Sequence, residues 1–74
     1  MMQVTNTEEI GKLVRATRKA QGLSQEALAG ASGVGPRFIV ELEKGKRTCE
    51  VGKVLLVMQM LGISVNVVPP EQLP

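Results

Sequence analysis

The sequence has no histidine and one cysteine, Cys49, among its 74 residues. A single cysteine cannot form a disulfide within the chain, and without histidine one chain cannot assemble a Cys/His zinc site. Ser24, Ser32 and Ser64 have no imidazole to activate them as nucleophiles. The sequence therefore predicts no catalysis, no metal and no other cofactor. Such sparse cysteine suits a reducing cytoplasm, where we expect the protein to act.

Long apolar runs are also missing, because the run Val54–Met58 is far too short to cross a bilayer. No signal peptide is visible, and the glycines between residues 30 and 35 lack the G-K-[ST] ending of a phosphate loop. A chain of this length allows one domain that buries about 60% of its unfolded surface, so a second chain is an expected source of stability. The net charge is only +2, yet residues 11–47 hold eight Lys/Arg against three Glu.

Residues 23–45 predict two short helices joined by a tight turn. Ser24 is a good N-cap for the first helix, and Ala27 and Leu28 are expected to face the core. Gly33 can adopt the positive φ that the turn needs, and Pro36 is tolerated in the first turn of the second helix. One face of that second helix is apolar and carries Phe38, Ile39 and Leu42. The other face carries Pro36, Arg37, Val40 and Glu41.

A further helix is expected on each side of this pair. The first begins at Thr7 and stops at Gly22, and its exposed face groups Lys12, Arg15 and Lys19. This basic face is either simply solvated or contacts phosphates, and Arg15 is the contact we select.

The last helix is expected to be capped by Thr48 and ended by Gly62. It is apolar nearly all round, since Val51, Val54, Leu55, Met58 and Leu61 share one face while Leu56, Val57 and Met60 lie opposite. The second face is either a subunit interface or part of one core; the small chain favours an interface.

Residues 63–68 alternate and are β-branched, which predicts a strand that has no evident mate in the chain. The simplest partner is the same strand of a second copy, beneath which the outer face of the last helix would pack. The predicted dimer interface comprises Leu56, Val57, Met60, Ile63, Val65 and Val67.

The runs G-L-S-Q-E-A-L-A, G-V-G and F-I-V-E-L-E-K-G-K resemble the Cro/cI-type (XRE) helix-turn-helix family, over about residues 10–68. Within it the chain is most similar to the HipB-like antitoxins, whose short chains end in a β-strand. The resemblance implies a mostly α, lambda-repressor-like bundle of four helices with a C-terminal strand that pairs across a dimer. The parts would be an N-terminal arm (1–6), a DNA-binding domain (7–62), a dimerisation strand (63–68) and a flexible tail (69–74).

The resemblance assigns base reading to the positions of Pro36, Arg37 and Glu41. Arg37 can bind guanine O6 and N7, and Glu41 could accept a hydrogen bond from cytosine N4. Pro36 stands where the family often has glutamine, and it can only pack on a thymine methyl. The alternative for these residues is a solvated helix face.

Phosphate contacts are expected from Ser24 and Gln25, which open a helix whose N-terminus presents free N–H groups. Lys44, Lys46 and Arg47 follow the recognition helix, and the first two match backbone-contacting positions of the family. The alternative is an ordinary charged loop. The family also pairs the position of Arg18 with that of Glu43, which implies a structural ion pair.

These features favour a sequence-specific repressor that binds a palindromic operator in double-stranded DNA as a homodimer. The HipB-like resemblance implies an antitoxin of the bacterial cytoplasm and nucleoid. It would autoregulate its operon and neutralise a HipA-like serine/threonine kinase toxin. The alternative is a small protein-interaction module with the same fold and no DNA binding. The basic residues around the helix-turn-helix favour the first interpretation.

Overall fold

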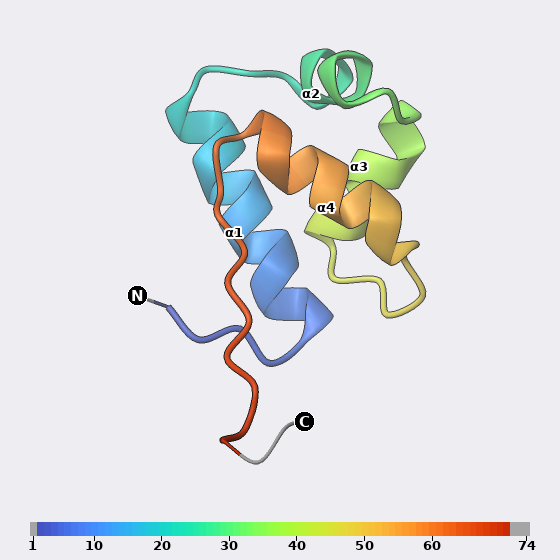
Figure 1. The fold of residues 1–74 in the computed structure, drawn as a ribbon. Helices are drawn as coiled ribbons and strands as arrows, with labels where there is room; N and C mark the ends of the chain where they lie inside the picture. Colours follow the sequence, from blue (N-terminus) through green and yellow to red (C-terminus); the bar gives the residue numbers. More distant parts are fainter. Residues whose placement is uncertain (1, 72–74) are drawn as a thin grey trace.

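The computed structural model describes residues 2–71 and contains four helices within them (Figure 1). They are α1 (Thr7–Ala20), α2 (Gln25–Ser32), α3 (Pro36–Glu43) and α4 (Val51–Met60). Helix α2 packs against α3 and α4, and α1 packs against α3. The predicted mostly α, four-helix fold is confirmed.

All four helices contribute to one apolar core. Its buried side chains are Val14, Leu28, Ala29, Ile39, Leu42, Val54, Val57, Met58 and Leu61. The expectation that Ala27 faces this core is wrong, because Ala27 is exposed and Ala29 is buried beside Leu28. The buried stripe of α2 is Leu28, Ala29 and Ser32, so it lies one residue further along the helix than the predicted pair.

The turn between α2 and α3 has the predicted geometry. Ser24 caps α2, since its Oγ accepts a hydrogen bond of 3.0 Å from the Ala27 N–H. Gly33 ends α2 in the left-handed region, at φ +72°. Pro36 then occupies the first turn of α3, where its missing N–H costs nothing.

Helix α4 begins later than predicted. Thr48 does not cap it; the N-cap position is Glu50, which makes no side-chain cap bond. Between them Cys49 packs against the core, so the chain reaches Glu50 before it turns into the helix.

The assignment of faces on α4 also needs correction. Val57, predicted for the dimer interface, is completely buried in the core of its own chain. Ile63 of the same predicted interface is half-buried against that core. Val51 and Leu55, predicted to face inward, are exposed, as are Leu56 and Met60. Because 100° per residue places Val57 beside Val54 and Leu61, the buried stripe is rotated from the predicted one.

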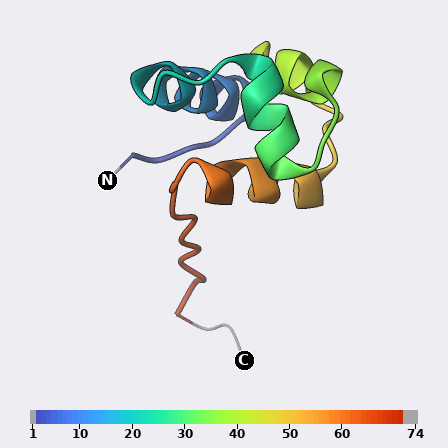
Figure 2. The same cartoon turned by 90° about the horizontal axis from the view of Figure 1, so that it is seen from above.

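Residues 63–70 are neither helix nor strand in the single chain, and Figure 2 shows them running away from the four helices. A strand requires a paired neighbour, so pairing across a dimer stays a prediction. The predicted tail extends into residues 72–74 and the predicted arm begins at residue 1, which lie outside the described residues.

Candidate nucleic-acid interface

Helix α3 is held in place by a buried ion pair with α1. Arg18 Nε donates to Glu43 Oε2 at 2.6 Å, and Arg18 Nη2 donates to Glu43 Oε1 at 3.0 Å. The remaining terminal nitrogen, Nη1, donates to the Leu23 carbonyl at 2.8 Å. Only 9% of the Arg18 side chain and 2% of the Glu43 side chain are exposed. Two-point geometry of this kind fixes both the distance and the rotation of α3 relative to α1.

Gln25 joins the same network. Its Nε2 donates to Glu43 Oε1 at 3.1 Å, which ties the first residue of α2 to the last residue of α3. Burial opposes ionisation of Glu43, but hydrogen bonds from Arg18 and Gln25 outweigh burial and lower the pKa of Glu43. Gln25, predicted as a phosphate contact, is half-buried and directs one amide N–H inward. Only the second N–H of the Gln25 side-chain amide is therefore left to bind a ligand.

The start of α2 is nevertheless an exposed concentration of donors. The Ser24 side chain is exposed, and because its Oγ only accepts in the cap, its own proton can be donated outward. The first N–H groups of α2 have no acceptor within the helix, and the helix dipole adds partial positive charge.

The outer face of α3 carries the three residues predicted to read bases. Pro36 is exposed, the Arg37 side chain is 91% exposed, and the Glu41 side chain is 31% exposed. Val40, which lies between Arg37 and Glu41 in the sequence, is half-buried. This face projects polar groups outward from a helix whose opposite side, at Ile39 and Leu42, is fully buried.

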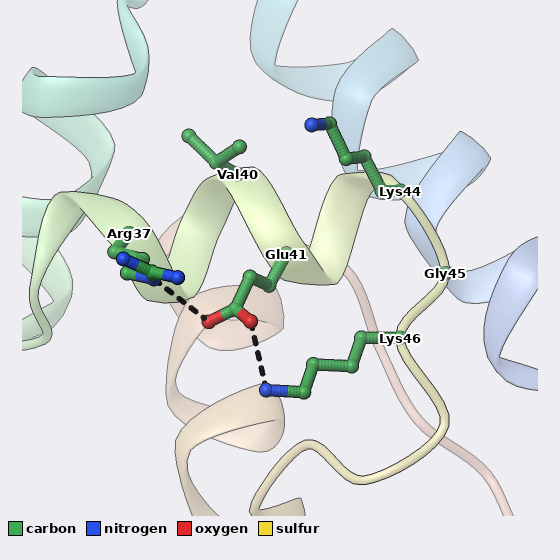
Figure 3. Close-up of a pocket in the computed structure, with 6 residues that line it drawn as sticks. All are labelled: Arg37, Val40, Glu41, Lys44, Gly45 and Lys46. Atoms are coloured by element: carbon green, nitrogen blue, oxygen red, sulfur yellow. Dashed lines mark hydrogen bonds and ion pairs between the residues drawn. The ribbon is translucent and has the colours of Figure 1, made fainter.

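Glu41 lies between two cations (Figure 3). Its Oε2 accepts from Lys46 Nζ at 2.7 Å, and its Oε1 is 3.8 Å from Arg37 Nε. The hydrogen bond from Lys46 lowers the pKa of Glu41, so the group is ionised at neutral pH. Lys44 and Val40 point to the other side of the helix in Figure 3. These residues, with Gly45, line one shallow open pocket.

The other predicted phosphate contacts are exposed at the edges of this surface. Lys44 and Arg47 lie in the turn after α3, and Arg15 lies on α1 close enough to Glu43 for its charge to favour the ionised carboxylate. The residues predicted to bind DNA thus come from the start of α2, the outer face of α3, the turn after it and Arg15 on α1. We call them the recognition surface: Arg15, Ser24, Gln25, Pro36, Arg37, Glu41, Lys44, Lys46 and Arg47.

Two contacts that shape this surface were missed from the sequence. One is the Lys46–Glu41 pair, whose spacing of five residues is outside the usual helical pairs at three and four. The other is a hydrogen bond of 2.9 Å from Thr7 Oγ1 to the Gly45 carbonyl. The chain reversal at Gly45, with φ +83°, makes both possible. A glycine after a helix indicates that the chain turns there, but it does not indicate which contacts the turn makes.

Two classes of site are not found in the described part of the chain. None of its helices has the length and apolarity needed to span a membrane. Residues 2–71 also contain no group of three or more acidic, cysteine or histidine side chains placed to hold a metal ion.

A capped helix, a glycine turn and a second helix with an exposed polar face define a helix-turn-helix domain. A buried ion pair fastens the second helix to α1. The chain belongs to the XRE-type helix-turn-helix family HTH_3, whose model matches residues 14–68. It is 52% identical over 70 residues to the HTH-type transcriptional regulator y4mF of Sinorhizobium fredii, covering 95% of this chain and 92% of that protein. It is also 33% identical over 63 residues to the HTH-type regulator YazB of Bacillus subtilis, covering 84% and 91%.

Solved structures show the same fold. The chain superimposes with a TM-score of 0.84 on a chain of a HipA–HipB–O2–O3 complex, at 15% identity, over 96% of this chain and 100% of that one. A TM-score of 0.70 at 33% identity relates it to the restriction-modification controller protein C.AhdI of Aeromonas hydrophila, over 78% and 88%. The predicted resemblance to the XRE family, with a HipB-like fold, is confirmed.

Proposed function

We propose that this protein is a DNA-binding transcriptional repressor that places α3 in the major groove. The recognition surface is the observation that carries the proposal. It combines an exposed α3 face, a helix N-terminus and a rim of basic side chains around a rigidly held helix. Arg37 would read guanine, Pro36 would contact a neighbouring base pair, and Glu41 would accept from cytosine. The names of the family relatives, all HTH-type transcriptional regulators, support this function.

Phosphates would be bound around that face. Ser24 and the N-terminus of α2 would contact one strand, with Gln25 contributing its remaining donor. Lys44, Lys46 and Arg47 would bind phosphates beyond the end of α3, and Arg15 would do so beside α1. Such contacts set the position of the protein on the duplex, while the α3 face sets sequence preference.

The repressor would act as a homodimer on a palindromic operator. Its interface would be the exposed side of α4 that carries Leu56 and Met60, together with a strand at residues 63–68. Val65 and Val67 would pair with their copies in the partner, whereas the buried Val57 takes no part. A HipB-like fold supports this arrangement, since strands need partners and the outer face of α4 is apolar.

The protein would further be the antitoxin of an operon that it represses itself, with a HipA-like kinase as its toxin. The fold shared with a HipB chain in a complex with HipA supports this partner. Co-expression with the product of the adjacent gene tests it: an antitoxin restores growth that the toxin arrests, and a chain that leaves growth arrested contradicts the role.

DNA binding is tested by selecting duplexes from a random-sequence pool with the purified protein. We expect enrichment of a palindrome whose half-sites lie about one helical turn apart. The region upstream of its own gene should contain that palindrome and shift in a gel assay. A pool that stays random after repeated rounds, with no shift of the upstream region, would reject the function and favour a protein-interaction module.

A further inference from the structure

We propose that Glu41 is a specificity-determining residue that couples the phosphate contact of Lys46 to the base facing α3. In the free protein Glu41 forms an ion pair with Lys46. When a cytosine amino group donates a hydrogen bond to the Glu41 carboxylate, Lys46 is released and can bind a phosphate. This inference rests on the proposed DNA-binding function and deepens it.

The Glu41 carboxylate is already engaged within the chain on both oxygens. Lys46 Nζ makes a short contact of 2.7 Å, while Arg37 Nε stays at 3.8 Å on a side chain that is 91% exposed (Figure 3). Arg37 can therefore turn toward a base at little cost. Lys46 is therefore the cation that its ion pair with Glu41 keeps away from a phosphate.

The Lys46–Glu41 pair is built into the backbone. The Lys46 N–H donates to the Glu41 carbonyl at 3.1 Å, so the main chain returns over the last turn of α3. Gly45 makes this return possible, since it has φ +83° and a Cβ there would lie 2.8 Å from Glu8 Cγ. Thr7 Oγ1 fixes the Gly45 carbonyl from the other side. Most surface ion pairs are weakened by the entropy lost when two long side chains are held in one geometry. Here the backbone hydrogen bond already holds Lys46 next to Glu41, so less entropy is lost when the side chains pair.

The pair is still weak enough to exchange its partner. Half of the Lys46 side chain and a third of the Glu41 side chain are exposed, and water screens such pairs. On a duplex with no donor at this position, the carboxylate keeps Lys46, and the neutral pair gains nothing from the phosphates. On a duplex that offers cytosine N4, the carboxylate gains a hydrogen bond and Lys46 becomes available. Base identity thereby controls one phosphate contact.

The test compares two duplexes of equal length: the palindrome selected by the wild-type protein and a scrambled version. Dissociation constants are measured by fluorescence anisotropy from about 50 mM to about 200 mM salt, where the slope reports released counterions. The variants are Glu41→Gln, Lys46→Met and the double variant. Glu50→Gln is the matched control, because Glu50 pairs with Lys53 at 3.6 Å outside the pocket. Circular dichroism verifies that each variant is folded.

Glu41→Gln should tighten binding to the scrambled duplex about two- to five-fold, the factor that corresponds to an exposed ion pair. Its salt slope on that duplex should steepen by about one, since one more lysine reaches a phosphate. In the Lys46→Met background no lysine can be released, so the steeper slope should vanish and the tightening should shrink to the effect of the removed carboxylate charge. Lys46→Met alone should flatten the slope more on the palindrome than on the scrambled duplex. Glu50→Gln should match the wild type on both.

Two results would overturn the inference while leaving DNA recognition intact. One is a Glu41→Gln protein that prefers the palindrome as strongly as the wild type and binds the scrambled duplex no better. The other is a Glu41→Gln effect of equal size with and without Lys46. If the wild-type protein selects no palindrome at all, the proposed function fails, and the inference fails with it.

Discussion

Arg37 and Glu43 lie on the same short helix, yet their charges are placed for opposite purposes. The Arg37 side chain is 91% exposed and that of Glu43 is 2% exposed. An exposed guanidinium contributes little to folding but is available to a ligand, whereas a buried carboxylate must be neutralised where it lies. Glu43 meets that demand through Arg18 and Gln25, and α3 is thereby held at a fixed orientation. The exposed residues can then be exchanged with little effect on the fold.

Arg37→Ala should weaken binding to the selected palindrome by about 1–3 kcal/mol and relax the preference at one base pair in each half-site. The reason is the loss of the proposed two-point contact to guanine, with no buried group disturbed. Affinities for the palindrome and for single-base variants of it measure the effect. An equal loss on palindromic and scrambled duplexes would mean that Arg37 contacts only phosphate.

Removal of one partner of the Arg18–Glu43 pair should be far more costly. We expect Arg18→Met or Glu43→Gln to lower the free energy of unfolding by about 3–5 kcal/mol, because the remaining group stays buried without compensation. The double variant should lose much less than the sum. Urea unfolding of the four proteins gives the coupling energy, and a value near zero would reject this role for the pair.

Acid should remove the contribution of the same pair. The unfolded Glu43 carboxyl takes a proton near its ordinary pKa of 4.5, whereas hydrogen bonds lower its pKa in the fold despite burial. Protons therefore bind the unfolded chain first, and the stabilisation present above pH 4.5 is lost as the pH falls through the lower, folded value. The stability difference between wild type and Glu43→Gln should shrink over that fall. A difference independent of pH would show that ionisation of Glu43 is irrelevant.

At the scale of elements, the features that could be predicted from the sequence are those that depend on single residues and their own backbone. Ser24 as a cap, Gly33 as the turn and Pro36 in the first turn of α3 each act through their own backbone, so their roles follow from residue type. Which face of α4 is buried does not follow from residue type. Nearly all positions of α4 are apolar, so several faces of the helix could equally well pack on the core. Val57 was misplaced for that reason.

In the recognition surface, too, some features could be predicted from the sequence and others could not. Its outward-facing α3 residues follow from the 3.6-residue period, and the Arg18–Glu43 pairing was available through the family resemblance. The bond from Gln25 to Glu43 and the Lys46–Glu41 pair could not be predicted, because both depend on how chain segments meet after folding. Thr48 failed as a cap because core packing of Cys49 delays the helix.

Gly11 decides how closely α1 can approach α3. A Cβ at Gly11 would lie 2.4 Å from the Leu42 carbonyl oxygen and 2.9 Å from that of Glu43, both of them backbone atoms. Gly11→Ala should therefore force the helices apart and cost about 1–3 kcal/mol of unfolding free energy.

Gly30→Ala is the matched control for that substitution. Gly30 lies inside α2, and no neighbouring atom lies within 4 Å of the place that an added Cβ would take. The change should therefore stabilise the fold by about 0.5–1 kcal/mol, because alanine has the higher helix propensity. Thermal unfolding of both variants checks the opposite signs. Equal effects would show that helix propensity, rather than the α1–α3 approach, governs Gly11.

At the scale of the whole molecule, apolar surface is concentrated on one helix and the segment after it. Val51, Leu55, Leu56 and Met60 are exposed on α4, and Val65, Val67 and Val68 are exposed on the segment that follows. A small domain rarely leaves so much apolar surface uncovered. A second copy would cover it, pair the two segments and place two α3 helices on one side of a duplex. One α3 alone would read too few base pairs to specify an operator.

The dimer is tested by ending the chain after Ser64, which removes the proposed strand but keeps Ile63, whose side chain packs on the core. This truncated protein should sediment as a monomer and lose its preference for the palindrome, since two half-sites about 34–36 Å apart need two linked recognition helices. A chain that ends after Val68 is the control, and it should dimerise and bind like the full protein. If the Ser64-terminated chain stayed dimeric and bound the palindrome as tightly as the control, the strand would be dispensable. The two copies would then have to meet through the outer face of α4 alone, which Leu56→Glu in the shortened chain would disrupt.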